Sequence, residues 1–245
     1  VGNLTRSGRH PCRVLNGAVQ CLDGNGTPTG VAPTCGYAYR FYVEADAGMV
    51  ALSGVGWPTL PVEQGTAPTV QATPFVPTPG GDPVYARNAV TSTKAAYVLA
   101  GHAADAGLAA VLDGNHSISC AYYASSENNW VFAYGTNPGV GIYMMAGSGG
   151  TAQVTWTGVD GGFANPETTI SAVGQWVVQT ATRSGTTFGI RANGTTATQT
   201  KTLEGIAPTT YNLYLGRNNS GSSPLGGALA GCTIYSCALT DAELT

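Results

Sequence analysis

The chain has few charged residues. Lys, Arg, Asp and Glu make up 9% of its 245 residues, and the formal net charge is only −3, whereas an average soluble domain has about 25% charged residues. The ten Lys and Arg residues are scattered along the sequence and form no basic stripe of the kind that nucleic-acid-binding proteins use. A nucleic-acid partner is therefore not predicted.

The sequence also lacks a long apolar run. Gly, Thr or Pro interrupts every hydrophobic stretch before it reaches the roughly 18 residues that a membrane-spanning helix needs, so no membrane span is predicted. Because 43% of the residues are hydrophobic, the composition does not fit a disordered chain either. The 35 Gly and 14 Pro residues instead predict a globular, turn-rich, all-β protein.

Metal-binding and redox cysteine motifs are missing as well. No Cys-x-x-Cys pair is present, and none of the three histidines lies at metal-ligand spacing from a cysteine, which argues against a zinc or thioredoxin-type site. The even number of cysteines favours disulfides and an oxidising, extracellular compartment, with buried thiols as the alternative for at least one pair. The disulfide candidates are Cys12, Cys21, Cys35, Cys120, Cys232 and Cys237.

The cysteine spacing favours one pairing and excludes another. Cys12 and Cys21 flank Asn16-Gly17, a strong two-residue hairpin signal, so a bridge between them is predicted. Cys232 and Cys237 are five residues apart on a predicted strand, which separates them by about 16 Å, too far for a disulfide. Each of these two therefore needs a distant partner. The candidate partners are Cys35 and Cys120.

Three regions differ in composition. Residues 1–57 form a Cys-rich N-terminal region of loops and strands. Residues 58–83 hold seven prolines. Because Pro lacks the N–H that a sheet ladder requires, this segment is predicted to be an extended linker or a strap on the surface rather than a helix or a central strand. Residues 84–245 contain short strands separated by turn residues, typical of a sandwich or barrel.

The strands predicted in the third region share short length and flanking turn signals such as Asp-Gly, Ser-Gly and Asn-Gly. Residues 239–244 are the one helix-like run there, a single turn in which Thr240 and Glu243 are placed as in a capping box. The predicted strands are residues 95–99, 109–112, 117–123, 130–133, 141–145, 152–157, 175–181, 187–192, 212–215 and 228–235.

Four motifs in this region occur in a characteristic order. A Trp-containing strand at 175–180 is followed by a strand ending in Asn-Gly at 187–194, a Leu-x-Leu-Gly strand at 213–217 and a closing segment at 231–244. This succession resembles the concanavalin A-like, laminin-G-type jelly roll over about residues 90–245. The resemblance implies an all-β, two-sheet jelly-roll sandwich, here preceded by a disulfide-stapled, Pro-rich N-terminal extension.

An earlier strand pair, residues 117–123 with 129–132, is similar to the same family but has Ala121 where an aromatic residue is usual. Relatives of the fold include glycoside hydrolases. Glu44 and Asp46 have the i, i+2 spacing of a nucleophile and its helper on one strand face, but Ala47, Gly48 and Met49 follow where a third carboxylate would have to protonate the leaving sugar. The protein is therefore predicted not to be an enzyme.

No cofactor is predicted apart from calcium, for which the sequence offers weak candidates. Asp23 and Asn25 place oxygen side chains at alternate positions, which suits calcium. The twelfth position of an EF-hand loop starting at Asp23 would be Thr34, so an Asx-type turn is the alternative. The resemblance implies a calcium site at a sheet rim, for which Asp113, Asp160 and Asn218 are candidates.

Exposed aromatic rings are candidates for glycan contacts, because sugars stack on such rings while Asn and Asp bind their hydroxyls. Ordinary core packing is the alternative reading of each ring. The candidate glycan contacts are Trp130, Tyr134, Trp156 and Tyr214.

Function is predicted at the level of three hypotheses. A surface poor in Lys and Glu is typical of interfaces, so the first is a non-catalytic adhesion or structural subunit that self-associates or contacts other assembly subunits. Such a subunit would be extracellular, at a cell surface, in a filament or on a virion. The alternative is a lectin-like, carbohydrate-binding module, with or without calcium. The third is a secreted glycoside hydrolase.

Overall fold

The structure is a computed structural model. It describes residues 106–135, 139–206, 213–217 and 225–244, together with the backbone of the strands between residues 12 and 99. Side chains are described within these ranges from residue 108 onward. The chain divides into two compact units, Val1–Gly36 with Leu239–Thr245 and Tyr37–Ala238.

The smaller unit contains a three-stranded antiparallel sheet in the order β1 (Cys12–Leu15), β2 (Ala18–Leu22) and β3 (Pro28–Thr29). Leu15 pairs with Ala18, so Asn16-Gly17 is the two-residue hairpin loop that the sequence predicts. The same register places Cys12 opposite Cys21. Both side chains lie outside the described residues, and their disulfide stays a prediction.

The predicted single turn at residues 239–244 is confirmed in the same unit. The Glu243 carboxylate accepts hydrogen bonds from the backbone N–H and the hydroxyl of Thr240, both at 2.7 Å. The Thr240 carbonyl in turn accepts hydrogen bonds from the N–H groups of Glu243, at 3.0 Å, and Leu244, at 3.2 Å. Glu243 therefore caps the turn through the Thr240 N–H.

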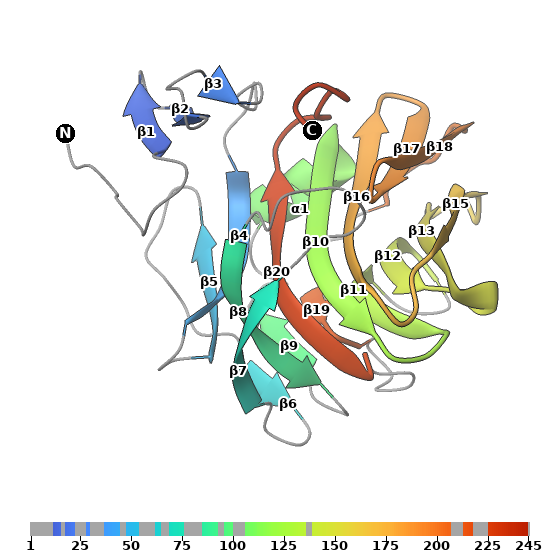
Figure 1. Cartoon of the computed structure of the whole chain (residues 1–245). Helices are drawn as coiled ribbons and strands as arrows, with labels where there is room; N and C mark the ends of the chain where they lie inside the picture. The colour runs from blue at the N-terminus through green and yellow to red at the C-terminus, as the bar shows by residue number, and fades with distance from the viewer. Residues whose placement is uncertain are drawn as a thin grey trace. The chain divides into compact units, whose positions relative to one another are not determined.

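The larger unit consists of two antiparallel sheets (Figure 1). One sheet has the order β18 (Thr195–Thr200), β17 (Thr187–Ala192), β16 (Trp176–Ser184), β10 (His116–Ala124), β20 (Gly227–Tyr235), β4 (Tyr37–Glu44) and β5 (Gly48–Ser53). Outside this order, β8 (Tyr85–Ser92) pairs with the first residues of β20, and β7 (Thr69–Phe75) pairs with β8. Near the C-terminal end of the chain, β20 lies between β10 and β4.

The second sheet of the larger unit has eight strands in the described part of the chain. Their order is β14 (Phe163–Ala164), β13 (Thr151–Thr157), β12 (Gly141–Ala146), β11 (Asn129–Gly135), β19 (Leu213–Leu215), β9 (Ala96–Leu99) and β6 (Val62–Gln64), with β15 (Glu167–Ser171) paired to β13. These two sheets confirm the predicted all-β jelly-roll sandwich.

The core lies between the sheets and follows the two-residue period of the strands. In β10, Ile118, Cys120 and Tyr122 are fully buried and belong to the core cluster. Cys120 forms a disulfide with Cys232, the residue directly opposite it on β20. The prediction that Cys232 bonds a distant cysteine is thus confirmed. Cys237 is disulfide-bonded as well.

One predicted strand is wrong. Residues 109–112 lie in helix α1 (Ala106–Asp113), whose Leu108 and Leu112 are buried four residues apart on one face. A short apolar run of Ala, Val and Leu does not distinguish a strand from a helix by its periodicity, and the Ala content favours the helix. No helix in the described part of the chain is long and apolar enough to cross a membrane.

The proline-rich segment 58–83 contains two strands. β6 is the last strand in the order of its sheet, and β7 pairs with β8 in the described part of the chain. Edge positions are where a strand tolerates proline, and Pro74 lies within β7. The division of the chain at residues 57 and 83 stays a prediction.

The hairpin between β17 and β18 explains why Asn-Gly occurs at its tip. Asn193 has φ 43° and Gly194 has φ 89°, the left-handed pair that a type I′ turn needs. The Asn193 amide also accepts a hydrogen bond from the Val178 N–H at 2.9 Å and donates one to the Trp176 carbonyl at 3.0 Å. The tip of this hairpin is therefore bonded to β16.

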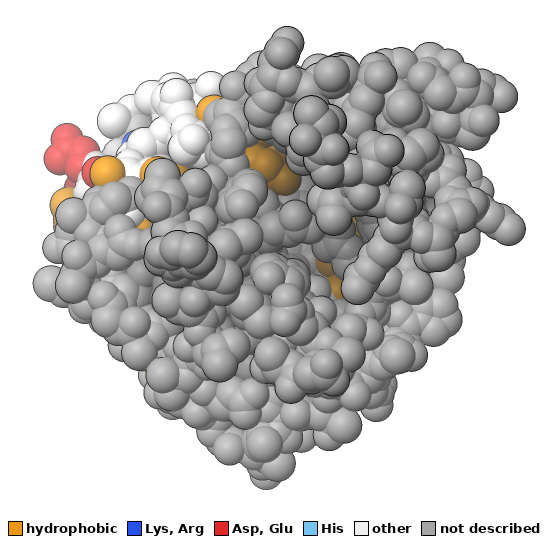
Figure 2. All heavy atoms as spheres, turned by 90° about the vertical axis from the view of Figure 1, so that its left-hand side faces the viewer, with side chains coloured by type: hydrophobic (Ala, Val, Ile, Leu, Met, Phe, Trp, Pro, Cys, Tyr) orange, Lys and Arg blue, Asp and Glu red, His pale blue; other side chains and the backbone are white. Residues whose placement is uncertain are grey.

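An ion pair joins α1 to β16. Arg183 Nη1 lies 4.0 Å from Asp113 Oδ1, and the Asp113 carboxylate is nearly half exposed, which makes the pair a weak one. On the face shown in Figure 2, acidic and hydrophobic side chains lie beside each other at the upper left, and further hydrophobic atoms are visible near the middle.

Candidate functional site

The outward face of the second sheet is set by the alternation of β13. Ala152, Val154 and Trp156 are fully buried in the core. Thr155 and Thr157, on either side of Trp156, are partly exposed on the opposite face. This division is the expected consequence of the two-residue period of a strand.

The neighbouring strand β12 adds two side chains to the same face. Its register pairs Tyr143 with Thr155 and Met145 with Gln153. Ile142 and Met144, between these positions, belong to the core. Tyr143 and Met145 therefore lie beside the threonine-bearing face of β13.

A β-bulge determines the orientation of Trp130 on β11. Strict alternation would put Trp130 on the same side as Phe132 and Tyr134, which are fully buried in the core. The register between β11 and β12 shifts between Trp130 and Phe132, and the additional residue, Val131, is also buried. Bulges reorient side chains in this way, and Trp130 is left partly exposed and paired with Met145.

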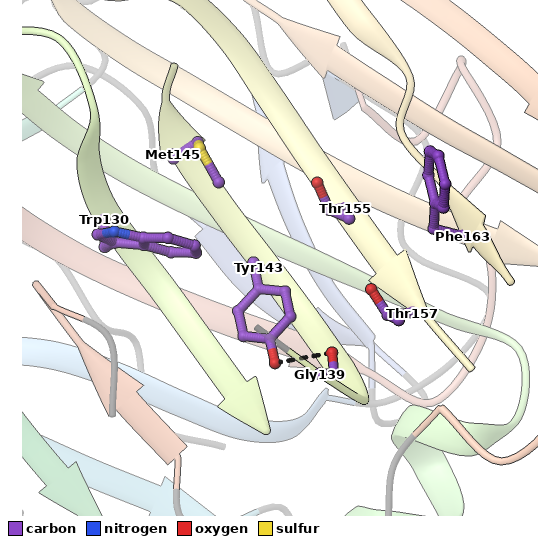
Figure 3. A pocket seen from close by; sticks show the side chains of 7 residues that line it. All are labelled: Trp130, Gly139, Tyr143, Met145, Thr155, Thr157 and Phe163. Carbon is purple, nitrogen blue, oxygen red and sulfur yellow. Dashed lines mark hydrogen bonds between the residues drawn. The ribbon is translucent and has the colours of Figure 1, made fainter. Parts of the chain in front are cut away.

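These outward-facing residues form a pocket of about 310 Å³ (Figure 3). Trp130 and Tyr143 meet edge to face, with ring centroids 5.4 Å apart and planes at 81°. Phe163, which is 61% exposed, lies at the opposite side of the pocket from Trp130. The lining residues are Trp130, Gly139, Tyr143, Met145, Thr155, Thr157 and Phe163.

The polar groups at the pocket are held by defined hydrogen bonds. The Tyr143 hydroxyl lies 3.2 Å from the carbonyl oxygens of Gly139 and Val140, to which it donates. The Thr155 hydroxyl donates to Asn165 Oδ1 at 2.8 Å. The Tyr143 ring is only 3% exposed, so its position is fixed before any ligand arrives.

Behind the pocket, β13 is anchored by a buried polar pair. Trp156 Nε1–H donates to His116 Nε2 at 3.1 Å, and His116 Nδ1 lies 3.1 Å from the Gly114 carbonyl. These contacts require a neutral imidazole with its proton on Nδ1. Burial, assisted by the nearby Arg183, lowers the pKa of His116 to about 4.

The family to which these sheets belong follows from comparison with known proteins. Residues 92–245, more than half of the chain, match the family model of the concanavalin A-like lectin/glucanase superfamily. The chain belongs to this superfamily. No curated protein sequence matches it.

Solved structures share this concanavalin A-like fold at low sequence identity. Domain 4 of an extracellular arabinanase from Geobacillus stearothermophilus is 15% identical, with a TM-score of 0.54 over 74% of this chain and 81% of that one. The binding domain of Paraclostridial Mosquitocidal Protein 1 is 12% identical, with a TM-score of 0.60 over 85% of this chain and 51% of that one. The binding domain of botulinum neurotoxin DC is 12% identical, with a TM-score of 0.55 over 85% and 50%. The chain thus spans about half of each toxin domain.

The four aromatic residues predicted as glycan contacts differ in their exposure: two are partly exposed and two are buried. Trp130 lines the pocket. Tyr214 is partly exposed on β19 and pairs with Ala133 of β11, while its neighbours Leu213 and Leu215 are buried. The prediction is wrong for Tyr134 and Trp156, because both are fully buried core residues that a ligand does not reach.

The predicted calcium ligands are not brought together in the described part of the fold. Asp113 Oδ1 accepts a hydrogen bond from the Ile206 N–H at 2.8 Å, and Asp160 Oδ1 accepts one from the Gly162 N–H at 3.2 Å. The described residues include no group of three or more His, Cys, Asp or Glu side chains able to hold a metal. The other candidates lie outside the described residues and stay predictions: Asp23, Asn25 and Asn218.

Sequence reasoning missed most of the pocket. The alternation of Thr155, Trp156 and Thr157 predicts that the threonines and the tryptophan face opposite sides, which was a usable signal. The bulge at Val131 and the exposed Phe163 have no comparable signature. The side chains of Glu44 and Asp46 lie outside the described residues, so that carboxylate pair stays untested.

Proposed function

We propose that the chain is a non-catalytic, carbohydrate-binding module and that the pocket between Trp130 and Phe163 is its glycan site. The observation that carries this proposal is the pocket's composition, in which an edge-to-face pair of aromatic rings adjoins two threonine hydroxyls on one open sheet face. Ligand pockets of this kind combine a mainly apolar lining with a few fixed polar groups.

The chemistry suits a sugar. The C–H face of a sugar ring packs against Trp130 and Met145, which are partly exposed, while the buried Tyr143 holds Trp130 in place from below. Thr155 and Thr157 offer hydroxyls to the polar edge of the sugar (Figure 3). A volume of about 310 Å³ is at the lower end of the range for ligand pockets. The pocket therefore suits a short part of a glycan chain.

Two relatives in fold support the same proposal by analogy. The arabinanase domain is described in complex with arabinotriose, and the binding domain of botulinum neurotoxin DC in complex with SialylT. Among the described residues that line the pocket, none has a carboxylate, whereas most glycosidases need a pair of them. We therefore propose binding without hydrolysis. An extracellular setting is proposed by analogy with the extracellular arabinanase.

The test is glycan binding with a matched pair of variants. Screening on a glycan array followed by calorimetry is expected to identify a ligand, and Trp130→Ala is expected to weaken its binding by about ten-fold or more. Trp176→Ala is the control, because Trp176 is also partly exposed and also packs edge-on against a tyrosine, Tyr123, at 6.1 Å. Trp176 lies on the other sheet.

The control variant is expected to bind normally. Equal losses in the two variants, or no glycan binding by the wild-type protein, would refute the assignment of the pocket. The alternative of an assembly subunit rests on the low charge of the sequence and stays a prediction, since the structural comparisons favour the carbohydrate-binding hypothesis. Light scattering of the purified protein measures its oligomeric state directly.

A further inference from the structure

We infer that the pocket selects uncharged glycans and discriminates against glycans that carry carboxylate or sulfate groups. This inference rests on the proposed function and adds to it the class of sugar that the site accepts. It is argued from the charges around the pocket rather than from its shape.

The first observation is the lining itself. Its described side chains are aromatic, thioether or hydroxyl groups, and none is charged. An anionic sugar that enters this pocket loses hydration without gaining a cationic partner among the described lining residues, and an unpaired charge removed from water is strongly disfavoured. A neutral sugar loses only hydroxyl hydration, which Thr155 and Thr157 partly replace.

The second observation is the distribution of charge in the sequence. Between Lys94 and Arg183 there is no Lys or Arg, whereas five acidic residues occur there. This stretch includes β10 through β15, and it supplies all the described residues that line the pocket. The acidic residues are Asp105, Asp113, Glu127, Asp160 and Glu167.

The structure places acidic residues close to the pocket. Thr157 pairs with Phe163, and both line the pocket. Asp160 lies in the turn between them, three residues from each, a contour length of at most about 11 Å. The Val159 N–H donates to the Glu204 carbonyl at 2.7 Å, so a second exposed acidic residue lies beside the same turn.

A further carboxylate lies across the sheet. Glu167 of β15 pairs with Gln153, which pairs with Met145 of the pocket. The Thr151 hydroxyl donates a hydrogen bond to Glu167. The pocket is thus bordered on two sides by strands or turns with negative charge.

The described cations belong mainly to the other sheet. Arg183 and Arg191 lie on β16 and β17. Lys201 follows β18 and precedes Glu204 by three residues, so one cation accompanies the two acidic residues at the turn that contains Asp160. Arg217 is the exception, since it follows β19 of the pocket's sheet, where the Gly216 N–H donates to the Val131 carbonyl at 2.9 Å. Arg217 is not among the residues that line the pocket. If the protein bound an anionic glycan more tightly than a neutral one, Arg217 would be the cation to test as its partner.

The experiment compares glycans that differ in charge. Calorimetry measures arabinotriose, cellotriose and lactose as neutral probes against 3′-sialyllactose and trigalacturonate as anionic ones. At least one neutral probe is expected to bind about ten-fold or more tightly than either anionic probe. Its affinity is expected to stay constant between about 0.05 and 0.5 M NaCl, because no charge pair is screened.

Variants make the result specific to this pocket. Thr155→Lys is expected to improve the binding of the anionic probes relative to the neutral ones, whereas Arg217→Gln is expected to leave the ratio unchanged. Tighter binding of an anionic probe by the wild-type protein would overturn the inference while the proposed function stands, and loss of that binding in Arg217→Gln would identify Arg217 as the partner of the anion. If no probe and no array glycan binds, the proposed function itself fails, and the inference falls with it.

Discussion

Acidification is expected to destabilise the protein through His116. The imidazole is fully buried, accepts a hydrogen bond from Trp156 Nε1 and lies within hydrogen-bonding distance of the Gly114 carbonyl. The pKa of His116 is lowered to about 4, first by burial and then by the charge of Arg183. The unfolded chain titrates near 6.5, so the two states bind protons over different pH ranges.

The sign follows from which state is protonated first. Above about pH 6.5 His116 is neutral in both states, and its contribution to stability is fully present. As the pH falls from about 6.5 to about 4, the unfolded state takes up the proton while the folded state does not. A difference of about 2.5 pKa units corresponds to about 3 kcal/mol of stability lost across this window.

The assay is urea unfolding at about pH 7 and about pH 4.5, with the wild-type protein compared with His116→Gln. The Gln amide can both accept from Trp156 and donate to Gly114, but it does not titrate. The wild-type protein is expected to lose about 2 to 3 kcal/mol more than the variant between the two pH values. Equal losses would show that His116 is not the titrating group, because the wild-type protein and the variant share all carboxylates and the other two histidines.

Two further predictions concern the covalent and conformational supports of the first sheet. Replacing both Cys120 and Cys232 by Ala is expected to lower the free energy of unfolding by about 5 kcal/mol, because the disulfide closes a loop with a sequence separation of 112. A loss below about 1 kcal/mol in urea unfolding would contradict this. Asn193→Ala is expected to cost about 2 kcal/mol, through its left-handed φ of 43° and its two backbone hydrogen bonds. Asn193→Gly keeps the backbone freedom and should cost less in the same assay, and an equal or larger cost would refute the conformational part of the argument.

The strands that could be predicted from sequence are those with a clear alternation or a clear turn. β17 has the predicted bounds, because the Ser184-Gly185 and Asn193-Gly194 turns mark its two ends. β13 begins one residue before its predicted start, and its apolar residues alternate strictly with polar ones. In these segments the local signal and the tertiary structure favour the same conformation.

Other strands have no such signal. β18 reads Thr-Thr-Ala-Thr-Gln-Thr and β15 reads Glu-Thr-Thr-Ile-Ser; neither contains a row of apolar residues at every second position. Both owe their conformation to pairing with β17 and β13. Pairing between distant segments is a tertiary property, so periodicity within each segment did not predict them.

The candidate site was predictable only in part, and its two tryptophans show why. Trp130 and Trp156 both lie in strands of the same sheet, and both were predicted to contact a glycan. Trp156 has core neighbours at every second position, Ala152 and Val154, so its burial follows from the alternation of β13. Trp130 has core neighbours at every second position as well, Phe132 and Tyr134, and the same reasoning would bury it.

What separates the two tryptophans is one additional residue. The register shift between Trp130 and Phe132 turns Trp130 to the outward face, where Tyr143 packs against it at 5.4 Å. A bulge depends on how two strands pair and not on the residues of one strand. The glycan site proposed here therefore depends on a feature of strand pairing, and the sequence supplies the aromatic residue without showing the side of the sheet on which it lies.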